Sequence, residues 1–167
     1  QLAFALEEYN NIARLYPGRY IVHLKMAELF KDLKEPDKAK AEYVRAIRHG
    51  GKYKYEAPIG LAKMYVKENR FDIAEDIVKE IENDRRIKVI EEIGDIYYLG
   101  GDFLSKGDRL EAIRKFKKAR DFYKKAGSKK DQKAFKRIQT LYAQISDTLA
   151  SNGEFKNAFN ILNLSLE

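Results

Sequence analysis

The stretch that decides the fold runs from Leu99 to Ala119 and reads LGGDFLSKGDRLEAIRKFKKA. Small residues and aromatic residues stand in it at fixed offsets, and charged residues fill the positions between them. The same offsets recur elsewhere in the chain. The stretch therefore predicts one unit of an internal repeat rather than an isolated pair of helices.

Two earlier segments share this spacing at a step of 35 residues. Small and aromatic positions recur in them as the pairs Tyr20/Tyr55, Ala27/Ala62, Phe30/Tyr65 and Ala39/Ala74. In the opening stretch these roles fall to Gly100, Phe103 and Ala112, and near the C-terminus the small positions are Ser146 and Ala158. We expect the small residues to face each other where two helices cross closely, and Phe103 and its equivalents to fill the wedge beside them.

This spacing resembles the tetratricopeptide repeat (TPR), which has a period of about 34 residues and two helices per unit. The resemblance implies an all-α fold in which antiparallel helix hairpins stack into a right-handed α-solenoid, the TPR superhelix. We expect a single TPR array over 1–167, with a half repeat at 1–19 and full repeats at 20–54, 55–85, 86–127 and 128–167. The array begins on a second helix and ends on one near Leu166, so we expect a fragment of a longer chain.

The repeat register predicts helices over 2–15, 20–33, 36–49, 55–68, 71–82, 85–105, 109–126, 129–151 and 154–166. Gly107 is expected to take the left-handed conformation that ends one helix, and Asp108 to begin the next helix, where the dipole favours an acid. In the first full repeat, Pro36 stands at the expected helix start in place of a glycine turn.

The array is not uniform in length. Gly100 and Ser146 are equivalent positions 46 residues apart, which exceeds the usual period by about 12 residues, or roughly three helical turns. The added length falls where helices 109–126 and 129–151 meet. We expect this longer hairpin to project past its neighbours, an irregularity typical of a natural protein rather than a consensus design.

The composition limits the kinds of chemistry that the chain can perform. Of its 167 residues 44% are hydrophobic and 35% are charged, which predicts a soluble, folded domain. No apolar run approaches the roughly 20 residues of a membrane span. Cysteine is absent, so disulfides, thiolate metal sites and cysteine nucleophiles are excluded. The localisation stays open, because the cytoplasm and the periplasm both tolerate a cysteine-free chain.

Motifs for catalysis are also missing from the sequence. The two histidines lie 26 residues apart on different predicted helices, a spacing that does not indicate a metal site. We expect His23 to pack between helices and His49 to end a helix before Gly50. There is no G-x-S-x-G motif and no P-loop. The sequence predicts no catalytic residue, metal or cofactor, and hence a protein that is not an enzyme.

The resemblance also implies a binding surface, since TPR ligands usually lie against the first helix of each pair. The positions that this implies for a partner-binding groove are Leu24, Glu28, Ile59, Lys63, Val66, Tyr97, Tyr98, Leu104 and Asp147. Gly94 and Gly101 are expected to leave room around Tyr97, so that the groove accepts an extended peptide or a helix with aliphatic anchors. The alternative, in which Tyr97, Tyr98 and Leu104 pack between repeats, remains open.

Positive charge is concentrated in one block. The net charge is +7, and residues 105–140 contain 14 Lys or Arg against 4 Asp or Glu. The basic patch comprises Arg114, Lys117, Lys118, Lys124, Lys125, Lys129, Lys130, Lys133, Lys136 and Arg137. A solvated helix face is one interpretation. Others are contact with an acidic protein, an anionic membrane surface or nucleic acid. The aromatics of this block fall at core offsets, so nucleic acid ranks below protein.

Together these features predict a non-catalytic scaffold that binds a protein, a peptide or a partner helix in its concave groove, with no small-molecule substrate. The groove would provide specificity and the basic hairpin attraction. The alternative is a structural subunit of a large bacterial assembly, such as a secretion, pilus or motility apparatus. Nucleic-acid binding through the basic hairpin comes third. Peripheral membrane contact and end-to-end self-association are further expectations.

Overall fold

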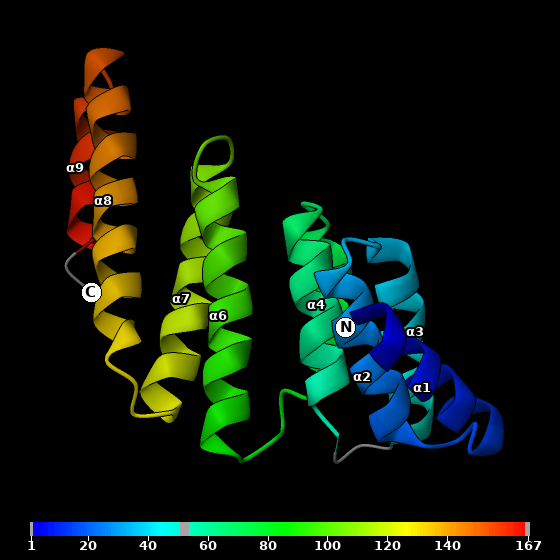
Figure 1. Ribbon diagram of the computed structural model, residues 1–167. Helices are drawn as coiled ribbons and strands as arrows, with labels where there is room; N and C mark the ends of the chain where they lie inside the picture. The colour runs from blue at the N-terminus through cyan, green and yellow to red at the C-terminus, as the bar shows by residue number, and fades with distance from the viewer. Residues whose placement is uncertain (1, 51–53, 166–167) are drawn as a thin grey trace. The chain divides into compact units, whose positions relative to one another are not determined.

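A computed structural model of the chain describes residues 2–50 and 54–165, and within these ranges the chain forms nine helices and no strand (Figure 1). The helices are α1 Leu2–Leu15, α2 Tyr20–Asp32, α3 Pro36–Gly50, α4 Glu56–Lys67, α5 Phe71–Lys79, α6 Ile87–Leu104, α7 Arg109–Lys125, α8 Lys130–Ser151 and α9 Phe155–Leu164. The predicted all-α fold of helix hairpins is confirmed, and each described boundary lies within three residues of its expected place. The expected end of the last helix near Leu166 lies outside the described residues.

The chain divides into two compact units, residues 1–83 and residues 84–167. The first unit contains α1 to α5, and the second contains α6 to α9. The division falls between the second and third predicted repeats. Each unit is described below by itself.

The core of the first unit forms where α2 and α3 cross. Ala27 of α2 and Ala39 of α3 are completely buried, as expected for the small positions of a close helix crossing. Tyr43 then connects this hairpin to α4, because its ring lies so close to Gly60 that a Cβ atom there would be 2.6 Å from a ring carbon. Glycine at position 60 therefore allows the ring to lie directly against the helix backbone.

The second unit repeats this design with different residues. Ala112 and Phe116 of α7 are completely buried, and they form one cluster with Ile138 and Leu141 of α8. In the last hairpin, the hydroxyl of Ser146 donates a buried hydrogen bond of 2.9 Å to the Ala158 carbonyl oxygen. The predicted small positions of α8 and α9 are thus in direct contact.

Helix α8 carries the added length. It has 22 residues, compared with 18 in α6 and 17 in α7. The expectation that this length falls where helices 109–126 and 129–151 meet is wrong, because Lys130 at the start of α8 contacts Asp95 of α6 at a separation of 35 residues. The part of α8 up to Tyr142 contacts α6 or α7, whereas Ser146 holds α9. Figure 1 shows the α8–α9 hairpin extending past the end of the α6–α7 hairpin.

Four helices end with the same hydrogen-bonded turn. In each, one residue takes a left-handed backbone conformation directly after the helix cap; these residues are Lys34 (φ 60°), Asn69 (φ 62°), Gly127 (φ 64°) and Gly153 (φ 81°). After α2, for example, the Glu35 N–H donates to the Phe30 carbonyl oxygen at 2.9 Å, and the Lys34 N–H donates to that of Lys31. This pair of bonds defines a Schellman motif, which satisfies carbonyl groups at the helix end.

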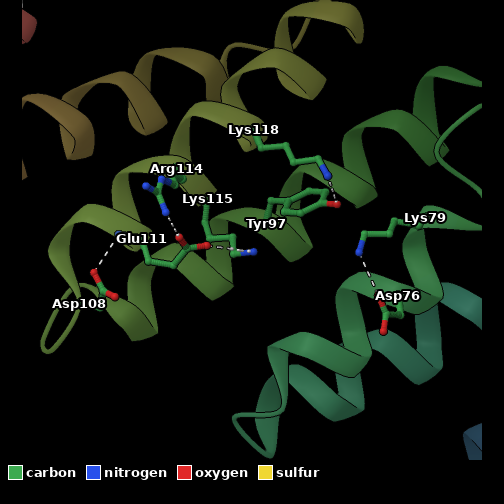
Figure 2. A network of polar contacts seen from close by, with 8 residues as sticks. All are labelled: Asp76, Lys79, Tyr97, Asp108, Glu111, Arg114, Lys115 and Lys118. Carbon is green, nitrogen blue, oxygen red and sulfur yellow. Dashed lines mark hydrogen bonds and ion pairs between the residues drawn. The ribbon is translucent and has the colours of Figure 1, made fainter.

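The turn between α6 and α7 differs from this pattern and corrects one prediction. Gly107 is not among the residues with positive φ, so the expected left-handed glycine at this position is wrong. The predicted start of α7 is confirmed, because the Asp108 carboxylate accepts a hydrogen bond of 2.9 Å from the Glu111 N–H (Figure 2). An acidic side chain in this place satisfies an amide that the helix leaves unpaired.

The expectation for Phe103 is also wrong. Its side chain is 47% exposed, although Phe30 is buried and Tyr65 is partly buried in the first unit. The space beside Ala112 is filled instead by Phe116, whose ring meets the ring of Tyr98 edge-on, with centroids 5.0 Å apart. Phe103 therefore lies at the surface of the second unit.

Candidate partner-binding surfaces

The structure separates the nine predicted groove residues into a buried group and an accessible group. The buried residues are Leu24, Ile59, Val66 and Tyr97. The partly or fully accessible residues are Glu28, Lys63, Tyr98, Leu104 and Asp147. The prediction of an open groove lined by all nine side chains is therefore corrected. The four buried side chains lie in the interior, where they contribute to packing.

Tyr97 is the clearest example of the buried group. Its side chain is 2% exposed, and its ring stacks on that of Phe122 with centroids 5.6 Å apart. The Lys118 ammonium lies over the same ring and donates a hydrogen bond to the Tyr97 hydroxyl (Figure 2). Tyr97 is accordingly a core residue of the second unit.

The two glycines expected to leave space around Tyr97 have another role. A Cβ atom on Gly94 would lie 2.8 Å from the ring of Tyr123, and one on Gly101 would lie 3.0 Å from the ring of Phe116. Both glycines thus admit an aromatic ring of α7 against the backbone of α6. They close the α6–α7 hairpin and do not open a groove.

The first helices of the second unit, α6 and α8, are joined by a ladder of side-chain contacts. Lys130 donates to the Asp95 carboxylate at 2.9 Å, Lys133 lies 4.9 Å from the ring centroid of Tyr98, and Arg137 donates to Asp102 at 2.6 Å; each pair is 35 residues apart. On both helices the residues recur at i, i+3 and i+7, so they form one row on each helix. We call the surface around this row the first-helix face of the second unit.

Around Lys130, this face contains a network of charged and polar groups. The hydroxyl of buried Tyr123 donates to Asp95 at 2.9 Å, and burial together with this carboxylate raises the pKa of Tyr123. Burial alone would lower the pKa of Lys130, but its hydrogen bonds to Asp95 and Glu91 hold that pKa above its ordinary value. The hydrogen bond from Ser128, with that from Lys130, lowers the pKa of Glu91. The network places two carboxylates around one ammonium group, and the lowered pKa of Glu91 favours its ionised form.

The basic patch consequently divides into neutralised and uncompensated cations. Lys130 and Arg137 pair with acids of α6, and Arg114 pairs with Glu111 of its own helix at 2.9 Å (Figure 2). The other exposed cations of the patch are Lys117, Lys124, Lys125, Lys129, Lys133 and Lys136. Lys118 belongs to neither group, because it is partly buried and donates to the Tyr97 hydroxyl. The uncompensated charge is therefore concentrated on α7, on the loop that follows it and on parts of α8.

Sequence analysis missed the acids of α6 and did not include Arg120 in the basic patch. The signal for Asp95 and Asp102 is their offset of 35 residues from Lys130 and Arg137, which equals the repeat step of the first unit. Arg120 has no comparable signal, because its environment depends on Phe135, which comes from another helix.

Both histidines have structural surroundings. His23 is buried, and its ring nitrogens lie 2.8 Å from a Glu42 carboxylate oxygen and 2.9 Å from the Pro17 carbonyl oxygen. Its ring also stacks on that of His49, with centroids 5.7 Å apart. Buried Glu42 accepts a further contact from Arg45. These groups satisfy one another and hold α2, α3 and the α1–α2 turn together.

The described residues, 2–50 and 54–165, lack the features of a metal site and of a membrane span. No group of three or more His, Asp or Glu side chains in these ranges is placed to hold a metal ion. None of the helices they contain has both the length and the apolar character needed to cross a bilayer.

The helix hairpins, their small residues at the crossings and their step of 35 residues define a TPR-type helical-repeat fold. The chain is similar to the crystal structure of MamA, with a TM-score of 0.61 and 17% sequence identity over 99% of this chain and 86% of that chain. It is also similar to a chain in the crystal structure of the APC/C hetero-tetramer Cut9-Hcn1, with a TM-score of 0.52 and 17% identity. That match covers 99% of this chain and 30% of the other, so this chain spans less than a third of it.

No protein-family model and no curated protein matches the sequence. At this level of identity the two structural matches establish the fold. The predicted resemblance to TPR proteins is confirmed in that sense.

Proposed function

We propose that the chain is a non-catalytic scaffold that binds a protein partner, as an extended peptide or a helix, on the first helices of its hairpins. The TPR-type fold supports a role in protein binding. The accessible residues Glu28 and Lys63 in the first unit, and Tyr98, Leu104 and Asp147 in the second, would contribute contacts.

The observation that carries this proposal is the environment of Tyr98. Its ring is held by the edge-on ring of Phe116 and by the Lys133 ammonium, yet the side chain remains partly exposed. A fixed, half-exposed tyrosine can bury area against a partner at little cost in side-chain entropy. Tyrosines of this kind are common among the residues that dominate binding energy.

Selection from a random peptide display library tests the proposal, followed by affinity measurements on the enriched peptides. We expect Tyr98→Ala to weaken binding of a selected peptide by about tenfold or more. Tyr16→Ala is the matched control, because Tyr16 is a 54% exposed tyrosine that belongs to none of the first helices α2, α4, α6 and α8. Failure to enrich any peptide, or equal affinity of the Tyr98→Ala and Tyr16→Ala variants, would overturn the proposal.

The alternative is a structural subunit of a larger assembly, and one surface favours it. Phe155, Phe159 and Leu162 are exposed on one side of α9, at the spacing i, i+4 and i+7. Such a stripe is typical of a contact surface. The Cut9-Hcn1 match is itself part of a hetero-tetramer, which is compatible with this role.

A further inference from the structure

We propose that Arg120, with the exposed lysines beside it on α7, forms a docking site for an acidic segment of a partner protein. This surface belongs to the second helix of its hairpin. It is separate from the first-helix face, and the function proposed above does not require it.

Arg120 differs from the two arginines of the basic patch in having no carboxylate partner among the described residues. Arg137 pairs with Asp102, and Arg114 pairs with Glu111. The Arg120 guanidinium instead lies over the ring of Phe135, 4.2 Å from its centroid, and its Nε atom is buried without a hydrogen-bond partner. The ring fixes the guanidinium plane without neutralising its charge. A fixed, unneutralised guanidinium is suited to a two-point contact with a carboxylate.

Further cations surround this guanidinium. Lys117 and Lys124 lie three residues before and four residues after Arg120, so they share its side of α7. Both are exposed. Lys117 lies over the ring of Tyr142 at 5.5 Å, so it too is positioned by an aromatic ring that leaves its charge uncompensated. The site therefore combines one half-buried guanidinium with two exposed ammonium groups.

The chemistry of the site favours spaced carboxylates over a nucleic acid. Stacking of bases needs accessible rings. Phe116, Phe122 and Tyr123 are buried, and Phe135 is covered by Arg120. Exposed Asp121 also interrupts the row of cations on α7, where it would repel a continuous phosphate backbone. An acidic peptide can place its carboxylates on either side of Asp121.

The test measures binding of a fluorescent oligoglutamate peptide to the full chain at low ionic strength. We expect Arg120→Gln to weaken binding about tenfold, because a fixed guanidinium contact is lost. Arg114→Gln removes the same charge from the same helix but from a cation that is already paired, so its effect should stay below about twofold. Arg120→Lys, which keeps the charge and loses the planar fork, should fall between them. Circular dichroism verifies folding, and Lys117→Gln combined with Lys124→Gln replaces Arg120→Gln if that variant unfolds.

Three outcomes would overturn the proposal. The first is no oligoglutamate binding at low salt. The second is an equal loss for Arg120→Gln and Arg114→Gln, which would show general charge attraction only. The third is tighter, Arg120-dependent binding of single-stranded RNA or phosphatidylserine vesicles, which would assign the site to that class. Tyr98→Ala should leave oligoglutamate binding unchanged, so this site and the first-helix face can fail independently.

Discussion

Gly101 of α6 lies so close to Ala112 of α7 that a Cβ atom on Gly101 would be 3.1 Å from the Ala112 carbonyl oxygen. The same atom would be 3.0 Å from a ring carbon of Phe116. Because the oxygen belongs to the helix backbone, it cannot move aside without a shift of α7. This contact explains the second glycine of the LGGDFL segment at the start of the deciding stretch.

Gly101→Ala should therefore destabilise the second unit. Alanine is a better helix former than glycine by about 1 kcal/mol, but overpacking typically costs about 1–3 kcal/mol. We expect a net loss of about 1 kcal/mol in the free energy of unfolding, measured with urea. Gly107→Ala is the control: a Cβ atom there meets nothing within 4 Å, so the change should be within about 0.5 kcal/mol. Equal stabilities of the two variants would contradict the close helix crossing.

The left-handed turn after α2 predicts a stabilising substitution. Lys34 has φ 60°, a conformation that costs most residues about 1–2 kcal/mol and glycine almost nothing. Lys34→Gly should raise the free energy of unfolding by up to about 1 kcal/mol, since glycine's greater freedom in the unfolded chain offsets part of the gain. Gly153→Ala, at φ 81°, should have the opposite sign. A loss of stability in Lys34→Gly would show that its side chain has a role besides the turn.

Burial of Tyr43 predicts a loss of stability in alkali. Burial, followed by the negative charges of Glu28 and Asp32, raises the pKa of Tyr43 from 10.0 to about 12. The folded state therefore holds the phenol proton more tightly than the unfolded state. The stability that this raised pKa contributes is fully present below pH 10 and is lost as the pH rises to about 12. Tyr43→Phe cannot ionise, so its urea-unfolding free energy should fall less over this range. Parallel profiles for the two proteins would refute the assignment.

The apolar stripe of α9 predicts self-association. Phe159 is 65% exposed between Phe155 and Leu162, so we expect concentration-dependent oligomers in analytical ultracentrifugation. Phe159→Glu should shift the distribution toward monomer and leave the helix content unchanged. Asn160→Glu adds the same charge on another side of the helix and should have little effect. A chain that stays monomeric at every concentration would count against this surface.

Tyr97 and Tyr98 should respond differently to truncation. Tyr97→Ala removes a stacked, buried ring, and we expect a loss of about 3 kcal/mol or more in the free energy of unfolding. Tyr98→Ala removes a partly exposed ring and should cost less. Thermal unfolding of both variants compares them directly. If Tyr97→Ala costs less stability than Tyr98→Ala, then α6 does not orient Tyr97 into the core.

These two tyrosines also show how far sequence reasoning extends. The helix boundaries could be predicted because small residues, turn residues and the step of 35 recur together. Which of two adjacent aromatics faces inward could not be decided, because neighbours on a helix differ by only about 100°. The resemblance placed both in the groove, whereas stacking on Phe122 makes Tyr97 a core residue.

The other differences between the sequence predictions and the structure depend on contacts between helices. Phe103 is 47% exposed and Phe30 is buried, although the two residues stand at the same repeat offset. The neutralisation of Lys130 and Arg137 required the position of α8 along α6. A pattern of charges along one helix contains no information on which acid a neighbouring helix presents, so the basic patch appeared more uniform than it is.

The length of α8 determines how far along the helix axis the last helix, α9, is attached. Its contacts with α6 follow the ordinary step of 35 residues, whereas Ser146, its contact with α9, is 46 residues beyond the equivalent Gly100. The surplus of 11 residues is close to three whole turns, or about 16 Å of helix, so it moves the attachment of α9 along the axis without rotating it. Removing seven of the residues between Arg137 and Ser146, close to two whole turns, would slide α9 back along α8 and keep its packing side, while removing two residues would turn that side away. Evolution or a designer can thus set the reach of the final hairpin in increments of whole turns.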